Sequence, residues 1–385
     1  MNFVAFSPHF PPNYLPFWVQ LRRLGVTILG LADTPWDDLS PDLRAVLTEY
    51  YYVWDAHDYD ALVRGMGYFT HRYGKVDRLE SHNEYWIESD ARLRTDFNIP
   101  GLHTADVARV KRKSEMKKMF HKAGLKYVRG RVCLTIEEAR AAGEEYGFPL
   151  VAKPDIGVGA NLTYRLESLA ELEEFFERKP LIDYIFEEFI DGQIVTFDGL
   201  TNQKAKIVFW SSMKYSGIMD IVNQGLDTWY IITRAIEPDV EAAGRKIAEV
   251  YRLRERFFHF EFFRTPAGEL IPLEVNMRPP GGLTTDMWNF ANDIDIFREY
   301  ANVVMFNKFE AEITRPYACA YVGRRFHLPY RHSHDEVLAA FPQQVVYHAP
   351  IHGVFSAAIG DFGYLVRSPD EDEVLAIAAY IQEKV

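Results

Sequence analysis

Three polar side chains alternate with apolar ones in the segment IPLEVNMRPPGG, residues 271–282. Glu274, Asn276 and Arg278 would share one face of a β-strand, because successive side chains of a strand point to opposite faces. A carboxylate and an amide oxygen can bind a hard divalent cation, and an arginine beside them can bind a phosphate group. The spacing predicts a place where a metal ion and a phosphate are held together. The plain structural alternative is a strand face on which Arg278 neutralises Glu274 by a salt bridge.

A second segment, FFHFEFF at residues 257–263, alternates in the same way and places His259 and Glu261 on one face. The proline and glycine of RTPAGEL, between the two segments, are typical of a turn. A loop at residues 266–269 sets Glu261 opposite Glu274 in an antiparallel pair. Two carboxylates about 5 Å apart repel each other unless a cation lies between them. Two or three oxygen ligands without sulfur favour Mg²⁺ or Mn²⁺, with phosphate oxygens completing the shell.

A lysine and a glycine-containing loop could supply more phosphate contacts. FPLVAKPDIGVGANLTYRLES places Lys153 at the end of an apolar strand, followed by Gly157 and Gly159. Glycines let backbone N–H groups approach an anion, and a lysine adds a point charge. The segment is neither a Walker A loop nor a complete G-x-G-x-x-G, because residue 162 is leucine. An ordinary turn is therefore the alternative here.

Two further segments carry charge in a suggestive order. In IFEEFIDGQIVTFDG, residues 185–199, Glu187 and Glu188 would point to opposite faces of a strand, which could offer polar groups to an adenine edge. The alternative is a strand end with solvated acids. The segment ARVKRKSEMKK, residues 108–118, holds six basic residues. It is either a solvated helix face or a helix that aims one lysine at a phosphate.

Other motifs exclude several chemistries. His332 and His334 have no third ligand at a recognisable spacing, which argues against zinc. The sequence has no H-E-x-x-H, no G-x-S-x-G and no cysteine in a nucleophile-like context. We therefore expect catalysis by positioning and electrostatics, without a covalent nucleophile on the protein.

The elements that must position these residues are of the α/β class. Apolar strand candidates at 2–6, 26–31 and 50–54 alternate with helical segments, including 58–72 and 83–97, which predicts a doubly wound α/β unit at the N-terminus. Two more helices are expected to begin at capping boxes, Thr135 to Glu138 and Ser168 to Glu171. After a strand at 184–190, segments 194–213 and 257–277 are expected to be antiparallel. Residues 317–366 are expected to be rich in strands before a last helix.

Composition and length limit the number of domains and the class of protein. A chain of 385 residues predicts two or three domains, and its net charge of −12 argues against a nucleic-acid binder with a broad basic surface. Two cysteines, Cys133 and Cys319, suggest a reducing compartment without a disulfide framework. Residues 1–21 carry no charged side chain, but four prolines interrupt them and no positive charge precedes them as in a signal peptide. We expect a soluble cytoplasmic protein that does not act on membranes.

The order of these motifs resembles the ATP-grasp superfamily, specifically its carboxylate–amine ligase branch, and more distantly biotin carboxylase and carbamoyl-phosphate synthase. The resemblance runs over about residues 84–310, and its most specific parts are LEVNMRPPGG and the Lys–Gly loop. It implies a doubly wound pre-ATP-grasp domain followed by a two-lobed ATP-grasp fold. The implied domains are 1–105 (pre-ATP-grasp), 106–188 (the lobe with the lysine and glycine loop), 189–310 (the lobe with the metal site) and 311–385 (a C-terminal region packing on the ATP-grasp domain).

The resemblance also implies roles, position by position. The nucleotide-binding residues would be Lys113, Lys153, Gly157, Gly159, Glu187, Glu188, Ile190 and Asp198. The metal ligands would be Glu261, Glu274 and Asn276, and Arg278 with Lys153 would be catalytic. One departure is that members often carry a glutamate soon after the "DG" of the hinge, where it contacts the ribose. Here Gln193 and Ile194 follow, while Asp198 remains.

The activity implied by the resemblance is phosphoryl transfer from ATP, with Mg²⁺ or Mn²⁺, to a small carboxylate, followed by attack of an amine and release of ADP. Three alternatives stay open: another acceptor, as in a carboxylase or thiol ligase; an ATP-binding sensor without turnover; and a Mg²⁺-dependent phosphohydrolase. Arg324 and Arg325 are either substrate-carboxylate ligands or surface residues. Family relatives are often dimers, so a homodimer is an expectation.

Overall fold

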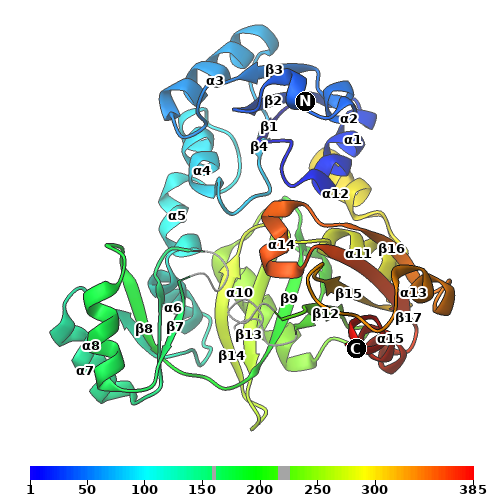
Figure 1. Ribbon diagram of the computed structural model, residues 1–385. Coiled ribbons are helices and arrows are strands. Elements are labelled where there is room, and N and C mark those ends of the chain that lie inside the picture. The colour runs from blue at the N-terminus through cyan, green and yellow to red at the C-terminus, as the bar shows by residue number, and fades with distance from the viewer. Residues whose placement is uncertain (158–161, 216–225) are drawn as a thin grey trace.

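The computed structural model describes residues 1–157, 162–215 and 226–385. Its strands form three sheets among the described residues, with four, four and nine strands. In Figure 1 the N-terminal sheet lies at the top, the second small sheet at the lower left and the large sheet at the lower right. The chain is therefore a mixed α/β protein, as predicted.

The N-terminal sheet is parallel, with the strand order β3-β2-β1-β4. Its strands are β1 (Asn2–Phe6), β2 (Thr27–Ala32), β3 (Glu49–Tyr52) and β4 (Arg78–Glu80). Its helices are α1 (Leu15–Arg23), α2 (Pro41–Val46), α3 (Tyr59–Tyr73) and α4 (Ile87–Asp96). Because the strands are parallel, the loops after β1 and β4 leave the same edge of the sheet.

Two boundaries in this unit differ from the sequence prediction. β3 ends at Tyr52 because the chain then turns outward, and Trp54 is 87% exposed. The helix expected over 83–97 begins only at Ile87, because Asn83 accepts a hydrogen bond from the backbone of Tyr85 and forms a turn. The turn leaves Glu84 outside the helix.

The second sheet follows α5 (Thr104–Lys111) and α6 (Lys113–Lys122) and has the antiparallel order β5-β8-β6-β7. Its elements are β5 (Gly130–Val132), α7 (Ile136–Tyr146), β6 (Leu150–Pro154), β7 (Tyr164–Leu166), α8 (Leu169–Arg178) and β8 (Tyr184–Glu188). The capping box from Thr135 to Glu138 is confirmed. The second box is half wrong: Ser168 caps α8, but Glu171 accepts from the backbone of Glu167 instead of Ser168.

The large sheet has the order β14-β13-β9-β11-β12-β15-β17-β16, with β10 paired to β9. Its strands are β9 (Gln193–Thr201), β10 (Ile207–Ser211), β11 (Met213–Tyr215), β12 (Trp229–Ile232), β13 (Phe257–Arg264), β14 (Leu270–Asn276), β15 (Ala318–Arg324), β16 (Val345–Pro350) and β17 (Phe362–Ser368). Its helices are α10 (Pro238–Tyr251), α11 (Thr284–Asn292), α12 (Ile296–Phe306), α13 (His334–Ala340), α14 (Gly353–Ile359) and α15 (Glu371–Gln382). The antiparallel pairing of 194–213 with 257–277 is confirmed, and α13 and α14 interrupt the C-terminal strands.

Helix α10 lies unusually close to the large sheet. A Cβ atom on its Gly244 would lie 2.1 Å from the ring of Phe197 in β9, so only glycine allows this approach. Phe197 in turn packs against Phe258 of β13, with the ring centroids 5.6 Å apart. The close packing holds the strand that carries Glu261 against a rigid backing.

Aromatic rings join the N-terminal unit to the large sheet. Phe17 of α1 lies 5.5 Å from Phe257 of β13 and 5.2 Å from Tyr300 of α12, measured between ring centroids. All three side chains are almost completely buried, and such pairs contribute roughly 1 kcal/mol each beyond the burial of their area. The contacts fix the N-terminal loops over one end of β13 and β14.

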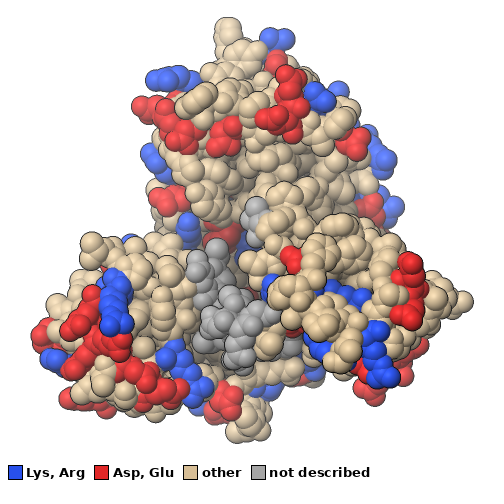
Figure 2. Space-filling view, viewed as in Figure 1, with Lys and Arg blue, Asp and Glu red and all other residues tan. Residues whose placement is uncertain are grey.

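The four implied domains stay a prediction in their boundaries. Among the described residues, no helix is both long enough and apolar enough to cross a membrane. On the face seen in Figure 2, basic and acidic side chains are interspersed and form no broad basic patch.

Candidate active site

The predicted register of the two acidic residues is confirmed. Glu261 of β13 pairs directly with Glu274 of β14, and His259 pairs with Asn276. A bulge next to this pair places an extra residue, Leu273, in β14. Two carboxylates and an amide therefore lie together at the end of one hairpin.

The two carboxylates of this pair are in different electrostatic states. Burial and the nearby charge of Glu261 raise the pKa of Glu274, although Lys113 opposes this shift. Burial alone would also raise the pKa of Glu261, but the hydrogen bond and charge of His259 lower it below its ordinary value. No hydrogen bond reaches the carboxylate of Glu274 or the amide of Asn276 in the part of the chain that the structure describes. The oxygen atoms of these two side chains accept no hydrogen bond from any described group, and they fit a hard divalent cation.

His259 lies between two acids. Its Nδ1 is 2.6 Å from Oδ1 of Asp198 on β9, and its Nε2 is 2.8 Å from Oε1 of Glu261. Despite burial, which lowers it, the two carboxylates raise the pKa of His259 to about 9. Strand alternation in the sequence predicted that His259 and Glu261 share one face, but it indicated no role for the histidine. Its position orients Glu261, as a partner behind a metal ligand does.

Lys113 is the first residue of α6 and reaches the acidic pair. Its Nζ donates to the carbonyl oxygen of Gly157 at 3.0 Å and lies 3.7 Å from Oε2 of Glu274. The helix start is held by Asp155, which accepts from the backbone and hydroxyl of Ser114. Lys113 is thus buried between the glycine loop and the predicted metal ligands. Gly159 lies outside the described residues.

Lys153 and a second lysine share one carboxylate. Nζ of Lys153 on β6 and Nζ of Lys117 on α6 each lie 2.7 Å from a carboxylate oxygen of Glu187 on β8. All three side chains are buried. Burial lowers the pKa of Lys117, while the charge of Glu187 opposes the shift. The helical spacing of Lys113 and Lys117, i and i+4, was the signal in the sequence that both point inward.

The remaining residues that were predicted to bind nucleotide are spread along the chain from β8 to β9. Glu188 points the opposite way from Glu187, as predicted, and pairs with Arg129 at 2.8 Å. The structure therefore does not bring it together with the buried lysines. Ile190 lies half-buried in the connection to β9. Asp198 is fully buried and, besides His259, accepts from the hydroxyl of Thr196 at 2.6 Å.

Arg278 meets the N-terminal unit. Its Nε lies 3.7 Å from Oε2 of Glu84, an oxygen that is buried and accepts no hydrogen bond from any described group. Burial raises the pKa of Glu84, while the charge of Arg278 opposes the shift. The loop after β1 also reaches this end, because Asn13 donates to the carbonyl oxygen of Gly282 at 3.0 Å. No sequence pattern pointed to Glu84, which lies almost 200 residues before Arg278.

Three other candidate site residues, Arg324, Arg325 and His332, make contacts within the protein. Arg324 and Arg325 are buried and donate to backbone carbonyl groups, Arg324 to Ile381 and Arg325 to Leu226, so the surface alternative was wrong. His332 pairs with Glu383. Among the described residues, no group of three or more histidine, cysteine or acidic side chains is placed to hold a metal.

Comparison with known proteins agrees with this geometry. No protein-family model matches the sequence. The chain is 26% identical over 250 residues to an L-arginine-specific L-amino acid ligase of Bacillus subtilis, which covers 59% of this chain and 60% of that ligase. The match thus spans less than two thirds of the relative's length.

Solved structures match over almost the whole chain. An L-amino acid ligase from Bacillus licheniformis superposes with a TM-score of 0.77 at 16% identity, covering 99% of this chain and 96% of that one. The biotin carboxylase domain of a Hydrogenobacter thermophilus 2-oxoglutarate carboxylase, solved with MgADP and bicarbonate, gives a TM-score of 0.70 at 14% identity and covers 95% of this chain and 86% of that one. These matches show that the chain shares its fold with an L-amino acid ligase and with a biotin carboxylase domain.

Proposed function

We propose that this protein is an ADP-forming ligase that joins a small carboxylic acid to an amine through an acyl phosphate. The observation that carries the proposal is a convergence of charge. Lys113, Glu274 and Glu261 meet at the β13–β14 hairpin, and Arg278 follows two residues after the end of β14. Phosphoryl transfer requires cations and metal ligands where charge is spread over phosphate oxygens.

The nucleotide and the metal ion have assigned places in this proposal. Lys113 and Lys153 bind the phosphates of ATP, and the connection near Ile190 borders the adenine. Glu187 holds the two buried lysines in place, and its strand, β8, contributes to the adenine site. Glu261, Glu274 and Asn276 hold Mg²⁺, which neutralises charge on the phosphate oxygens when it is bound. His259 keeps Glu261 ionised and oriented.

The chemistry runs in two steps. A carboxylate oxygen of the acid attacks the γ-phosphorus of ATP, the bond from that phosphorus to the β–γ bridging oxygen breaks, and ADP leaves. The neutral amine then attacks the acyl carbon, the bond to the phosphate oxygen breaks, and the nitrogen loses a proton to solvent. Arg278 stabilises the charge on the transferring phosphate, and the buried site keeps water away from the acyl phosphate.

The substrate class follows from the pair at the domain junction. Glu84 offers a buried oxygen without a hydrogen-bond partner, beside the guanidinium of Arg278. An amino acid carries the complementary charges, with its carboxylate toward Arg278 and its ammonium group toward Glu84. The similarity to an L-amino acid ligase supports this class. We propose that at least one substrate is an amino acid.

The test is the release of ADP from Mg·ATP with pooled amino acids and small carboxylates. We expect release to require both an acid and an amine. The variant Glu274→Gln should lower it by about two to three orders of magnitude, because it removes a metal ligand. Glu269→Gln is the matched control, since Glu269 lies on the same hairpin but pairs with Lys126 at the surface.

Other results would point elsewhere. Release that needs an acid and a thiol would replace the amine by a thiol, and release that needs bicarbonate as the acid would favour a carboxylase. Release without any acid would contradict the ligase and favour a phosphohydrolase. Binding of ATP without turnover in any pool would favour the sensor. A homodimer stays a prediction, which sedimentation of the chain would test.

A further inference from the structure

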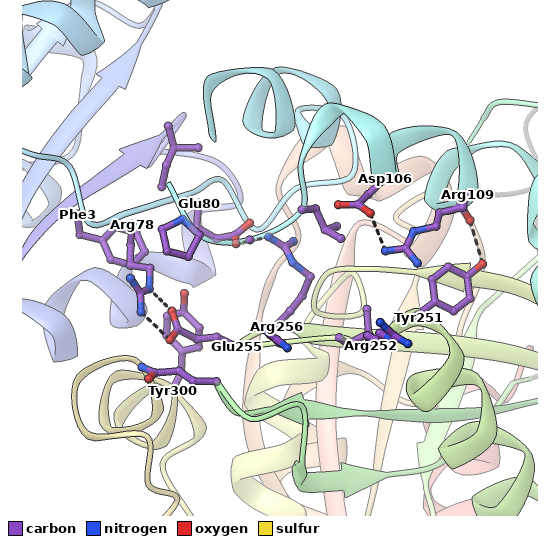
Figure 3. Close-up of a pocket in the computed structure, with 17 residues that line it drawn as sticks. Phe3, Arg78, Glu80, Asp106, Arg109, Tyr251, Arg252, Glu255, Arg256 and Tyr300 are labelled. Atoms are coloured by element: carbon purple, nitrogen blue, oxygen red, sulfur yellow. Dashed lines mark hydrogen bonds and ion pairs between the residues drawn. The ribbon is translucent and has the colours of Figure 1, made fainter. Parts of the chain in front are cut away.

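A second cavity lies at the junction of the N-terminal unit and the large sheet (Figure 3). Its volume is about 340 Å³, within the range of small-molecule sites. It is bounded by β4, by the turn from residue 100 to 102, by the start of α12, and by residues 251–256, which connect α10 to β13. None of its lining residues belongs to the candidate active site.

The lining carries an excess of positive charge. Five arginines line the cavity against three acids, Glu80, Asp106 and Glu255. The arginines are Arg78, Arg109, Arg252, Arg254 and Arg256. This arrangement, which we call the arginine pocket, is unexpected in a chain with a net charge of −12.

Three of the arginines are held by the acids. Arg78 binds Glu255 through two hydrogen bonds, as Figure 3 shows. Nη2 of Arg256 lies 2.6 Å from Glu80, and Nη2 of Arg109 lies 2.6 Å from Asp106. These pairs hold the guanidinium groups in place before a ligand binds. Binding therefore costs little side-chain entropy.

The pairs leave donors unused. Nε of Arg109 is buried and has no hydrogen-bond partner among the described residues. The side chains of Arg252 and Arg254 are exposed and make no ion pair or hydrogen bond with any described residue. Two unpaired cations and a buried unpaired donor therefore face one cavity, which is the chemistry of a site for an oxyanion.

The rest of the wall is apolar. Phe3, Leu79, Leu102, Leu253 and Tyr300 line the cavity, and each is largely buried. Their edges leave some apolar surface on the cavity wall, which an inorganic ion alone would not cover. An anion attached to a flat or branched apolar body would cover them.

We propose that the arginine pocket binds a small organic anion, a phosphate or carboxylate group carried on an apolar body. Its occupant is distinct from the substrates of the ligase reaction. The pocket borders the active site from behind: Arg256 donates to the carbonyl oxygen of Met277 at 2.8 Å, directly before Arg278. Residues 252–256 also lead into β13, which carries His259 and Glu261.

The test is calorimetric titration of the full chain with phenyl phosphate, benzoate and inorganic phosphate. Saturating Mg²⁺ and a non-hydrolysable ATP analogue occupy the active site. We expect phenyl phosphate or benzoate to bind at one site per chain, and the organic anion to bind more tightly than inorganic phosphate. Of phenyl phosphate and benzoate, the anion that binds more tightly indicates whether the natural ligand carries a phosphate or a carboxylate group.

Variants locate the site. Arg252→Gln/Arg254→Gln should weaken this binding by about tenfold, because it removes both unpaired cations. The matched control, Arg64→Gln/Lys122→Gln, removes two exposed cations elsewhere and should leave binding unchanged. Arg278→Gln should also leave it unchanged. If the double variant folds poorly, Arg254→Gln alone tests the same weakening of anion binding.

Three results would overturn the proposal: no saturable binding of either organic anion, equal binding in the wild type and in Arg252→Gln/Arg254→Gln, or loss of binding in Arg278→Gln. The last result would place the anion in the active site. Because the titration does not depend on turnover, its failure is distinguishable from failure of the ligase proposal.

Discussion

Two networks of buried charge lie at the junction of the N-terminal unit and the large sheet, and they differ in how completely they are satisfied. In the first, Arg94 donates to the carbonyl oxygen of Leu79 and lies 3.0 Å from Glu80 and 3.5 Å from Asp90. In the second, Glu274 and Glu84 each have a single cation at 3.7 Å. Arg94 thus has partners at 3.5 Å or less, although Oδ1 of Asp90 has none among the described residues, whereas the two acids of the second network have no described partner at hydrogen-bond distance. The comparison separates structural from functional charge.

The largest expected effect is on the first network. Arg94→Met removes a fully buried cation and leaves Glu80 and Asp90 with less compensation. It should lower the free energy of unfolding by about 3–5 kcal/mol. Urea unfolding measures this loss, and the activity per folded molecule should stay close to that of the wild type. An Arg94→Met variant that is as stable as the wild type but inactive would contradict the structural role of this network.

The second expected effect is on the candidate active site. Arg278→Gln should lower kcat/KM by about two to three orders of magnitude, because the guanidinium stabilises charge that develops on phosphate. Its free energy of unfolding should change little, because Nε of Arg278 lies 3.7 Å from Glu84, beyond hydrogen-bond distance. Steady-state kinetics with urea unfolding of the same sample tests both. A large loss of stability with normal kinetics would assign Arg278 to the fold.

A third effect concerns pH. His82 is buried among the rings of Phe17, Trp18 and Tyr300, and burial lowers its pKa to about 4. An unfolded histidine titrates near 6.5, so the folded state binds fewer protons. Its contribution to stability is present above about pH 6.5 and is lost as the pH falls toward 4.

The variant His82→Phe isolates this effect. Between about pH 7 and pH 5, the wild type should lose on the order of 2 kcal/mol of unfolding free energy through His82. The loss measured for the variant should be smaller than that of the wild type by this amount. Denaturant unfolding at the two pH values measures the difference. Equal losses in both proteins would show that other groups cause the acid sensitivity.

The smallest effect separates two neighbouring acids. Glu188→Gln breaks an ion pair with the half-exposed Arg129 and should change stability by less than about 1 kcal/mol and the KM for ATP only slightly. Glu187→Gln loses the carboxylate shared by Lys117 and Lys153 and should raise that KM strongly. If both variants raised it equally, Glu188 would belong to the nucleotide site after all.

The sequence could predict what depends on local spacing. The pairing of Glu261 with Glu274 was predicted from strand alternation and a loop at 266–269; the turn is one residue longer, and the bulge at Leu273 restores the predicted register. The parallel N-terminal unit follows from alternating strands and helices. It could not predict Glu84 beside Arg278, because only the packing of α1 on β13 and α12 brings those segments together. It also placed Arg324 and Arg325 either at the surface or on a substrate, since a sequence does not show which carbonyl groups a buried arginine will meet.

The central claim, an acyl phosphate formed on a carboxylate, is tested most directly by isotope transfer. The substrate acid is labelled with ¹⁸O in its carboxylate and turned over with unlabelled Mg·ATP and an amine. If the acid attacks the γ-phosphorus, the released phosphate must carry one oxygen from the acid, and mass spectrometry will show one ¹⁸O per phosphate. Phosphate without label would contradict the account, because its extra oxygen would then have come from water.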